Sequence, residues 1–91
     1  MSVIFEVPVA LVRYSNSQIS LELEGENVQE TLDNLWLRFP ELRKRVLDDT
    51  GELFPYLLLF RNGRKLPRND FSSIAVVNGD KLELIALAEG G

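Results

Sequence analysis

Lys81-Leu82-Glu83-Leu84-Ile85-Ala86-Leu87 is the stretch that most constrains the fold, and Ala88-Glu89-Gly90-Gly91 follows it directly. Leu82 and Leu84 alternate with outward positions, which is typical of a half-buried strand. Asn78-Gly79-Asp80 comes just before this strand and has the residue types of a tight turn. The end of the chain is therefore predicted to be a turn, a strand and a short diglycine tail.

Two further strand-like segments lie near the start of the chain. Apolar residues alternate in both, at Val3, Phe5 and Val7 and again at Ile19, Leu21 and Leu23. Pro8 lacks an amide hydrogen and so is expected at the end of the first strand. Arg13–Ser17 is short and polar, which suits a hairpin-type turn. The two segments are therefore predicted to form an antiparallel pair.

One main helix is predicted next. Asn27, with Glu30 three residues later, resembles a capping box. Apolar residues then recur at helical spacing, at Val28, Leu32, Leu35, Trp36 and Phe39. We interpret Trp36 as a core residue of this stripe in preference to a binding residue. Pro40 ends or restarts the helix, and a short second helical piece follows through Leu42, Val46 and Leu47.

The third strand is the continuous apolar run Tyr56–Phe60, which is typical of an interior strand. Asn62-Gly63 follows it and indicates a hairpin, because both positions of such a turn need positive φ. The returning strand must be short, since Pro67 comes soon afterwards. Asn69–Val77 is expected to be a connection with one helical turn at Asp70–Ile74.

The order of elements is strand, strand, helix, strand, short strand, strand. It predicts an α+β domain over residues 1–87, with the first and last strands side by side and the helix across one face of the sheet. Residues 88–91 are expected to form a flexible tail.

The composition excludes several classes of function. The 91 residues include no cysteine and no histidine, which removes disulfides, thiolate nucleophiles, the usual zinc ligands and the commonest general base. We therefore expect a protein that is not itself an enzyme and holds no metal. The net charge of −4 disfavours nucleic acid as a partner. Short apolar runs disfavour a membrane, and the first residues do not resemble a secretion signal, so a cytoplasmic location is expected.

Two charged stretches allow alternative interpretations. Asp48–Glu52 lacks the ligand spacing of a calcium loop and is interpreted as a solvated turn. Four basic residues gather around the predicted hairpin, at Arg61, Arg64, Lys65 and Arg68. They either attract an acidic partner surface or keep an edge strand soluble.

The order of elements, the length and the ending resemble the ubiquitin-like β-grasp family, and more narrowly the MoaD/ThiS sulfur carriers. The matching positions are Val7-Pro8, Asn62-Gly63, Asn78-Gly79-Asp80, Leu82, Leu84 and Gly90-Gly91. The resemblance implies a mixed five-strand sheet with one main helix packed across one face. Leu87 and Glu89 depart from the usual residues before the diglycine, while the long segment Phe39–Gly51 is similar to carriers of molybdopterin or cysteine synthesis. The molybdopterin type is favoured.

The resemblance also implies what the tail does. An E1-like adenylating enzyme would use ATP and Mg²⁺ to form an acyl adenylate on Gly91, and sulfur would then replace the nucleotide to give a thiocarboxylate. The sulfur would pass to a substrate held by a synthase large subunit or another sulfur-transfer enzyme. The chain itself would bind no cofactor. Ala88, Glu89 and Gly90 would enter the partner's channel, where a glycine admits close approach because it has no Cβ.

Other functions are compatible with the same residues. A ubiquitin-like modifier would join Gly91 to lysines of target proteins, and a β-grasp interaction module would use no tail chemistry. A terminal Gly-Gly could also be a frayed end with no role.

A docking surface is expected beside the tail. If Leu82 and Leu84 face the helix, Ile85 and Leu87 face away from it. The third strand is apolar on both faces, and the resemblance favours Leu58 and Phe60 as its outward residues. These four residues would form an exposed apolar patch for a partner. The alternative is that loops or a dimer contact cover the patch.

Overall fold

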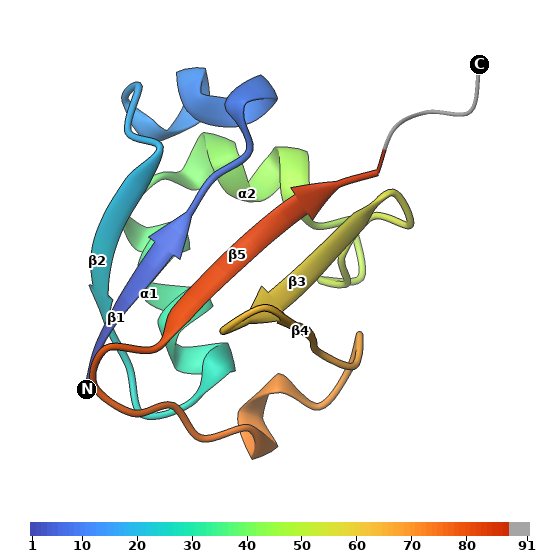
Figure 1. Ribbon diagram of the computed structural model, residues 1–91. Helices are drawn as coiled ribbons and strands as arrows, with labels where there is room; N and C mark the ends of the chain where they lie inside the picture. Colours follow the sequence, from blue (N-terminus) through green and yellow to red (C-terminus); the bar gives the residue numbers. More distant parts are fainter. Residues whose placement is uncertain (88–91) are drawn as a thin grey trace.

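The computed structural model describes residues 1–87 as a mixed five-stranded sheet with helices across one face (Figure 1). The strands are β1 (Ser2–Glu6), β2 (Ser20–Glu24), β3 (Leu57–Arg61), β4 (Arg64–Lys65) and β5 (Lys81–Ala86). The helices are α1 (Val28–Arg38) and α2 (Pro40–Val46), with 3-10 turns η1 (Val9–Ser15) and η2 (Phe71–Ser73). The predicted α+β class, with one main helix across the sheet, is confirmed.

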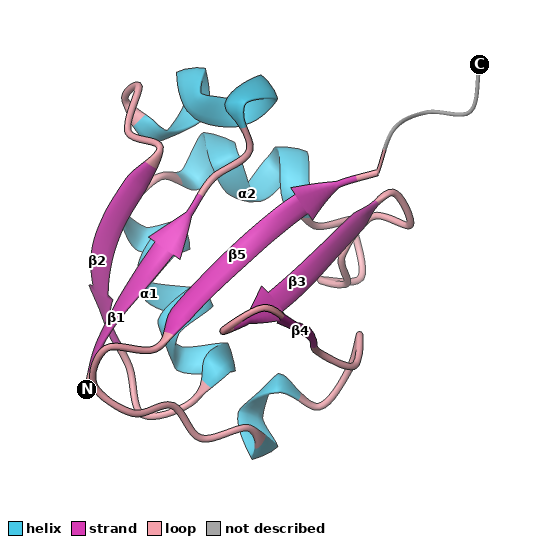
Figure 2. Ribbon diagram, in the orientation of Figure 1, coloured by secondary structure: helices cyan, strands magenta, loops and turns pink. Residues whose placement is uncertain are grey.

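Strand β5 lies in the middle of the sheet, whose order is β2-β1-β5-β3-β4 (Figure 2). It runs parallel to β1 and antiparallel to β3. Leu82 and Leu84 point into the core and are 0% and 3% exposed. The last strand in the sequence therefore joins the pair β1 and β2 to the pair β3 and β4. The predicted pairing of the first and last strands is confirmed.

The connection between β1 and β2 differs from the prediction. The two strands do pair antiparallel, but η1 occupies the place of the expected turn at Arg13–Ser17. Pro8 precedes η1 in an extended conformation, with φ −59° and ψ 143°, and its carbonyl accepts a 2.8 Å hydrogen bond from the Leu11 amide at the start of η1. Leu11 and Val12 pack against the core, which explains why this segment coils beside α2 at the end of β1 (Figure 1). Ile19 is 53% exposed and lies before β2, so its assignment to the inward face was wrong.

The start of α1 confirms the predicted cap. The Asn27 side chain accepts a hydrogen bond from the Glu30 amide at 2.8 Å, and the Glu30 carboxylate accepts from the Glu26 amide at 3.1 Å. This is the reciprocal arrangement of a capping box, except that the Glu30 carboxylate binds the amide one residue before the cap instead of the amide of the cap itself. Pro40 occupies the first turn of α2, so the chain restarts as a second helix after Phe39.

The core lies between the helices and the inner face of the sheet. It contains the inward residues of the strands together with the apolar stripes of α1 and α2: Val3, Phe5, Val7, Leu21, Leu23, Val28, Leu32, Leu35, Trp36, Leu42, Val46, Leu57, Leu59, Leu82 and Leu84. Trp36 is 8% exposed, so its assignment to the core is confirmed.

Two turns meet at one end of β5 and are tied together by Asp80. Asn62 and Gly63 both have positive φ, at 50° and 84°, as the predicted hairpin requires. The Asp80 carboxylate accepts hydrogen bonds from the Val77 amide and from the Asn62 side chain, each at 2.9 Å. These two bonds, in that order of importance, hold the pKa of Asp80 below its ordinary value. The ionised carboxylate therefore stabilises the junction where β5 begins.

We expect Asp80→Ala to lower the free energy of unfolding at neutral pH by about 1–3 kcal/mol, because it leaves two donors without their acceptor. The folded-state pKa lies below the unfolded value of 3.8, so this contribution is complete above the unfolded pKa and is lost as the pH falls through the folded pKa. Urea unfolding of both proteins between pH 7 and about pH 2.5 measures the difference. A difference that stays constant throughout that range would contradict the role of the charge.

Candidate functional site

Alternate residues of β3 and β5 place apolar side chains on the face of the sheet that the helices do not cover. Leu57 and Leu59 are buried at 0% and 2% exposure, whereas Leu58 and Phe60 are only half-buried. In β5, Ile85 is half-buried in the same way. Leu58 and Phe60 are therefore the outward residues of β3, as expected from the resemblance.

The strand register brings these outward residues together. Leu58 is the direct partner of Ile85, and Phe60 stands between Glu83 on β5 and Lys65 on β4. Directly opposite residues of an antiparallel pair have side chains in contact range. Three of the four predicted interface residues thus lie next to one another on a single surface.

The fourth predicted residue, Leu87, follows β5 and extends its pairing with the chain before β3. Its amide donates a 2.7 Å hydrogen bond to the carbonyl of Tyr56. Leu87 and Tyr56 are 47% and 42% exposed. We use the name outer patch for the five residues of this strip: Tyr56, Leu58, Phe60, Ile85 and Leu87.

Tyr56 was not among the predicted interface residues. It precedes β3 instead of belonging to it, and its ring stacks on Phe54 with centroids 5.6 Å apart. A signal for it existed in the sequence, because Tyr56 has the same parity as Leu58 and Phe60. In a strand, alternate residues point to the same face, so extending the outward series Phe60, Leu58 by two positions toward the N-terminus would have included Tyr56.

The position of the outer patch along the chain links it to the tail. Leu87 is the last residue that the structure describes, and it lies where the C-terminal end of β5 meets the start of β3. The predicted tail residues Ala88, Glu89, Gly90 and Gly91 lie outside the described residues. Their proposed roles stay predictions, but the surface from which they depart is defined.

The basic cluster near the hairpin divides into two pairs with different roles. The Arg61 guanidinium donates to the Ala75 carbonyl at 2.7 Å, and the Arg68 guanidinium donates to carbonyls before β3 and at its first residue. Arg64 and Lys65 are exposed and form no ion pair within residues 1–87. Only the second pair is available to an acidic partner surface.

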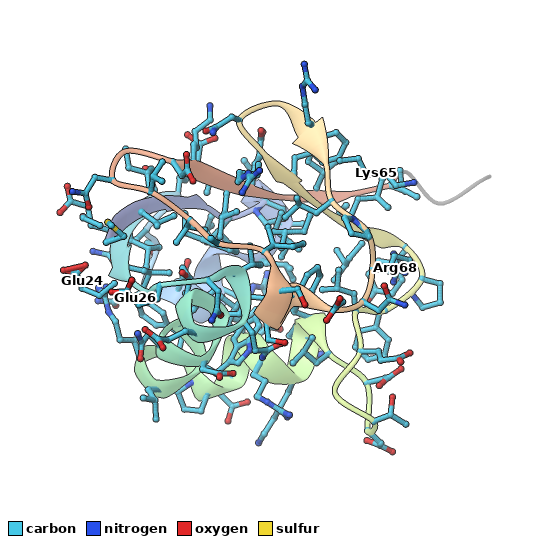
Figure 3. All side chains as sticks on the ribbon, turned by 90° about the horizontal axis from the view of Figure 1, so that it is seen from below. Glu24, Glu26, Lys65 and Arg68 are labelled. Atoms are coloured by element: carbon cyan, nitrogen blue, oxygen red, sulfur yellow. The ribbon has the colours of Figure 1, made fainter. Side chains whose placement is uncertain are left out.

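Charge is distributed unevenly across the sheet. Glu24 and Glu26 lie on one side of the molecule, and Lys65 and Arg68 lie on the other (Figure 3). Nearer the middle of the sheet, the Lys81 ammonium and the Glu6 carboxylate form an ion pair at 3.8 Å. The outer patch is therefore flanked by acidic and paired charges on its β1 side and by free basic charges on its β4 side.

Elsewhere in residues 1–87, the structure shows fewer features of a functional site. No group of three or more acidic side chains in this part could hold a metal ion. Nor is any of its helices both long and apolar enough to cross a membrane. An open pocket of about 180 Å³, lined by residues that include Glu52, Arg68 and Asp70, contains no member of the outer patch. In the loop Asp48–Glu52, the Asp48 carboxylate accepts hydrogen bonds from Thr50 and Glu52, as in a self-contained turn.

The sequence and the fold are similar to those of known small proteins of about the same length. The sequence model of the ThiS family matches residues 4–91. No curated protein sequence matches the chain significantly. SAMP1, the small archaeal modifier protein 1 of Haloferax volcanii, has a TM-score of 0.82 and 26% identity, with 100% of both chains covered.

Two further solved structures are similar. A chain of the Amycolatopsis orientalis BexX/CysO complex has a TM-score of 0.83 and 21% identity, covering 98% of this chain and 99% of that one. CysO of Mycobacterium tuberculosis has a TM-score of 0.82 and 17% identity, covering 94% and 99% respectively. At these identities the two likenesses concern the fold alone.

The orientation of β3 can be tested by truncating neighbouring leucines. We expect Leu57→Ala to cost about 2–5 kcal/mol of unfolding free energy, because it leaves a cavity in the core. Leu58→Ala should cost about 1 kcal/mol or less, because its side chain already contacts solvent. Chemical denaturation of both variants measures the two losses. Equal losses would show that β3 does not present one face to the core and the other to solvent.

Proposed function

The chain belongs to the ThiS family of ubiquitin-like β-grasp proteins, and from this premise we propose that it is a sulfur carrier that acts through the carboxylate of Gly91. The observation that carries the proposal is the position of β5, whose last residues leave the sheet beside the outer patch. The family match also extends to Gly91. The chain would serve as a protein co-substrate and not as a catalyst.

The proposed chemistry begins with activation of an unreactive group. A terminal carboxyl has an ordinary pKa near about 3.5, so at neutral pH it is an anion and a poor electrophile. One carboxylate oxygen would attack the α-phosphorus of ATP, and pyrophosphate would leave. Sulfide would then add to the acyl carbon and AMP would leave, which gives the thiocarboxylate with no change of oxidation state. ATP, Mg²⁺ and the sulfur donor would all be held by partner enzymes.

The outer patch supplies the docking surface in this proposal. Protein interfaces commonly have an apolar centre and a polar rim, and here Leu58 and Ile85 form a centre with Lys65 and Glu83 at its edges. The partners would be an E1-like adenylating enzyme and a sulfur-accepting enzyme, with molybdopterin synthesis as the favoured destination. That a structural relative was solved in the BexX/CysO complex supports the use of this fold as a binding partner.

A second candidate function is protein modification. It is favoured by the 26% identity to SAMP1, which is named a small archaeal modifier protein. A modifier needs the same activated Gly91, but the acyl group would pass to the amine of a target lysine. The two candidates therefore share the first step and differ in the nucleophile that follows.

Intact-mass spectrometry tests the proposal. The full chain is incubated with ATP, Mg²⁺, sulfide and the E1-like adenylating enzyme of the same organism. We expect a mass gain equal to the exchange of one oxygen for sulfur, located at Gly91 by fragmentation. A variant that lacks Gly91 is the matched control and should stay unchanged. Lysine conjugates in cell extracts, without the exchange, would favour the modifier, and neither product would overturn both candidates.

A charge placed in the outer patch should weaken docking. We expect Leu58→Glu to reduce affinity for the adenylating enzyme about tenfold or more, because a carboxylate would be buried unpaired in an apolar interface. Leu37→Glu is the control, since Leu37 is 82% exposed on α1 and outside the patch. Calorimetry measures both affinities, and circular dichroism checks that both variants are folded. Equal affinities for the two variants would exclude the outer patch as the docking surface.

A further inference from the structure

The guanidinium of Arg68 holds the turn that precedes β3. Its Nη1 donates to the Leu57 carbonyl at 2.7 Å, and its Nη2 donates to the Leu53 and Phe54 carbonyls at 2.7 and 2.9 Å. Arg68 lies in the connection after β4, so these bonds join segments that are distant along the chain. Three carbonyls within five residues are thus held by one side chain.

The turn Leu53–Leu57, which Arg68 holds, contains the backbone carbonyl that binds the Leu87 amide. The Tyr56 carbonyl, which accepts from the Leu87 amide at 2.7 Å, lies between the Phe54 and Leu57 carbonyls that Arg68 holds. A further bond from the Leu57 amide to the Phe54 carbonyl at 3.0 Å closes the turn. The Leu57 amide belongs to the same peptide group as the Tyr56 carbonyl, so this bond and the Arg68 bond to the next carbonyl restrict the rotation of the Tyr56 carbonyl.

We propose that Arg68 is a positioning residue for the tail. By holding the turn Leu53–Leu57, it fixes the pairing of Leu87 with Tyr56 at the end of β5. A fixed Leu87 would lower the entropic cost of bringing Gly91 into the active site of a docked adenylating enzyme. The effect on activation rests on the proposed function, while the clamp itself does not.

An arginine is needed for this arrangement. Its planar guanidinium presents five donors in a fixed fork and stays charged at all physiological pH values, whereas a lysine ammonium is a single point with rotating donors. Within residues 1–87, the Leu57 carbonyl also has no strand beside it, because β4 pairs with Phe60 and Arg61 and the Leu66 amide after β4 reaches only the Leu59 carbonyl. A lysine ammonium also has three donors, but all are on one nitrogen, whereas here Nη1 binds the Leu57 carbonyl and Nη2 binds the Leu53 and Phe54 carbonyls. A lysine is therefore not expected to hold all three carbonyls in their present relation.

Arg38 provides a matched control on the opposite edge of the sheet. Its Nη1 donates to the Glu22 carbonyl of β2 at 2.9 Å, and its guanidinium lies 5.3 Å from the centre of the Phe39 ring. Like Arg68, it caps a free strand edge from a neighbouring segment, but it is remote from Leu87 in the sheet order. A general loss of stability should affect both arginine variants, whereas a loss of tail positioning should affect only Arg68.

Amide hydrogen exchange tests the clamp without any partner. We expect the Leu87 amide to exchange about tenfold faster or more in Arg68→Lys and Arg68→Ala than in the wild type, and to be unchanged in Arg38→Ala. If Arg68→Ala does not fold, Arg68→Lys alone decides. Unchanged exchange at Leu87 in the folded Arg68 variants would overturn the proposal.

Steady-state activation kinetics test the consequence for the tail. With the adenylating enzyme and ATP, we expect Arg68→Lys to lower kcat/KM for the carrier about tenfold, mainly through KM, while Arg38→Ala keeps the wild-type values. The measurements are made at a temperature where circular dichroism shows both variants folded. Wild-type kinetics for Arg68→Lys would overturn the positioning role. If the wild type itself is not activated, the proposed function fails, and hydrogen exchange still decides whether Arg68 holds the end of β5.

Discussion

The pairing of β5 with both β1 and β3 is the interaction on which the rest of the structure depends. Without it, β1 with β2 and β3 with β4 are two separate hairpins, and two-stranded hairpins are only marginally stable in water. Leu82 and Leu84 close the core from the sheet side when β5 enters. Because β5 is the last strand in sequence, the sheet is completed by long-range contacts, and the chain leaves the core next to β3.

The face of the sheet away from the helices follows from the same pairing. An antiparallel sheet with one solvated face is usually polar there, yet Leu58 and Ile85 meet on this face as direct partners. Their neighbours Glu83 and Lys65 are charged, which limits the apolar area that water contacts. Such a surface keeps the free protein folded and still offers apolar area to a partner.

Both edges of the sheet are protected by side chains. On β2, the Glu22 and Glu24 carbonyls accept from Arg38 and Asn34 of α1. At the other edge, where the short β4 does not reach the start of β3, the Leu57 carbonyl accepts from Arg68. Uncapped edges pair readily with other chains, so these contacts favour a monomeric sheet. Under the proposed function, the chain would contribute the Gly91 carboxylate, and partner enzymes would supply the other reactive groups.

The elements whose signals are local could be predicted from the order of amino acids alone. The Asn27 cap, the Asn62-Gly63 hairpin, the apolar stripe of α1 and the inward residues of β5 all depend on neighbours a few positions away, so they could be predicted. The resemblance added the outward orientation of β3. Two features depend on contacts that the whole fold creates. The segment η1 coils because Leu11 and Val12 pack on the core. Arg68 binds three carbonyls that lie 11 to 15 positions away in the sequence. A side chain's distant partners depend on which elements the whole fold brings together, so the conformational preferences of neighbouring residues do not predict them.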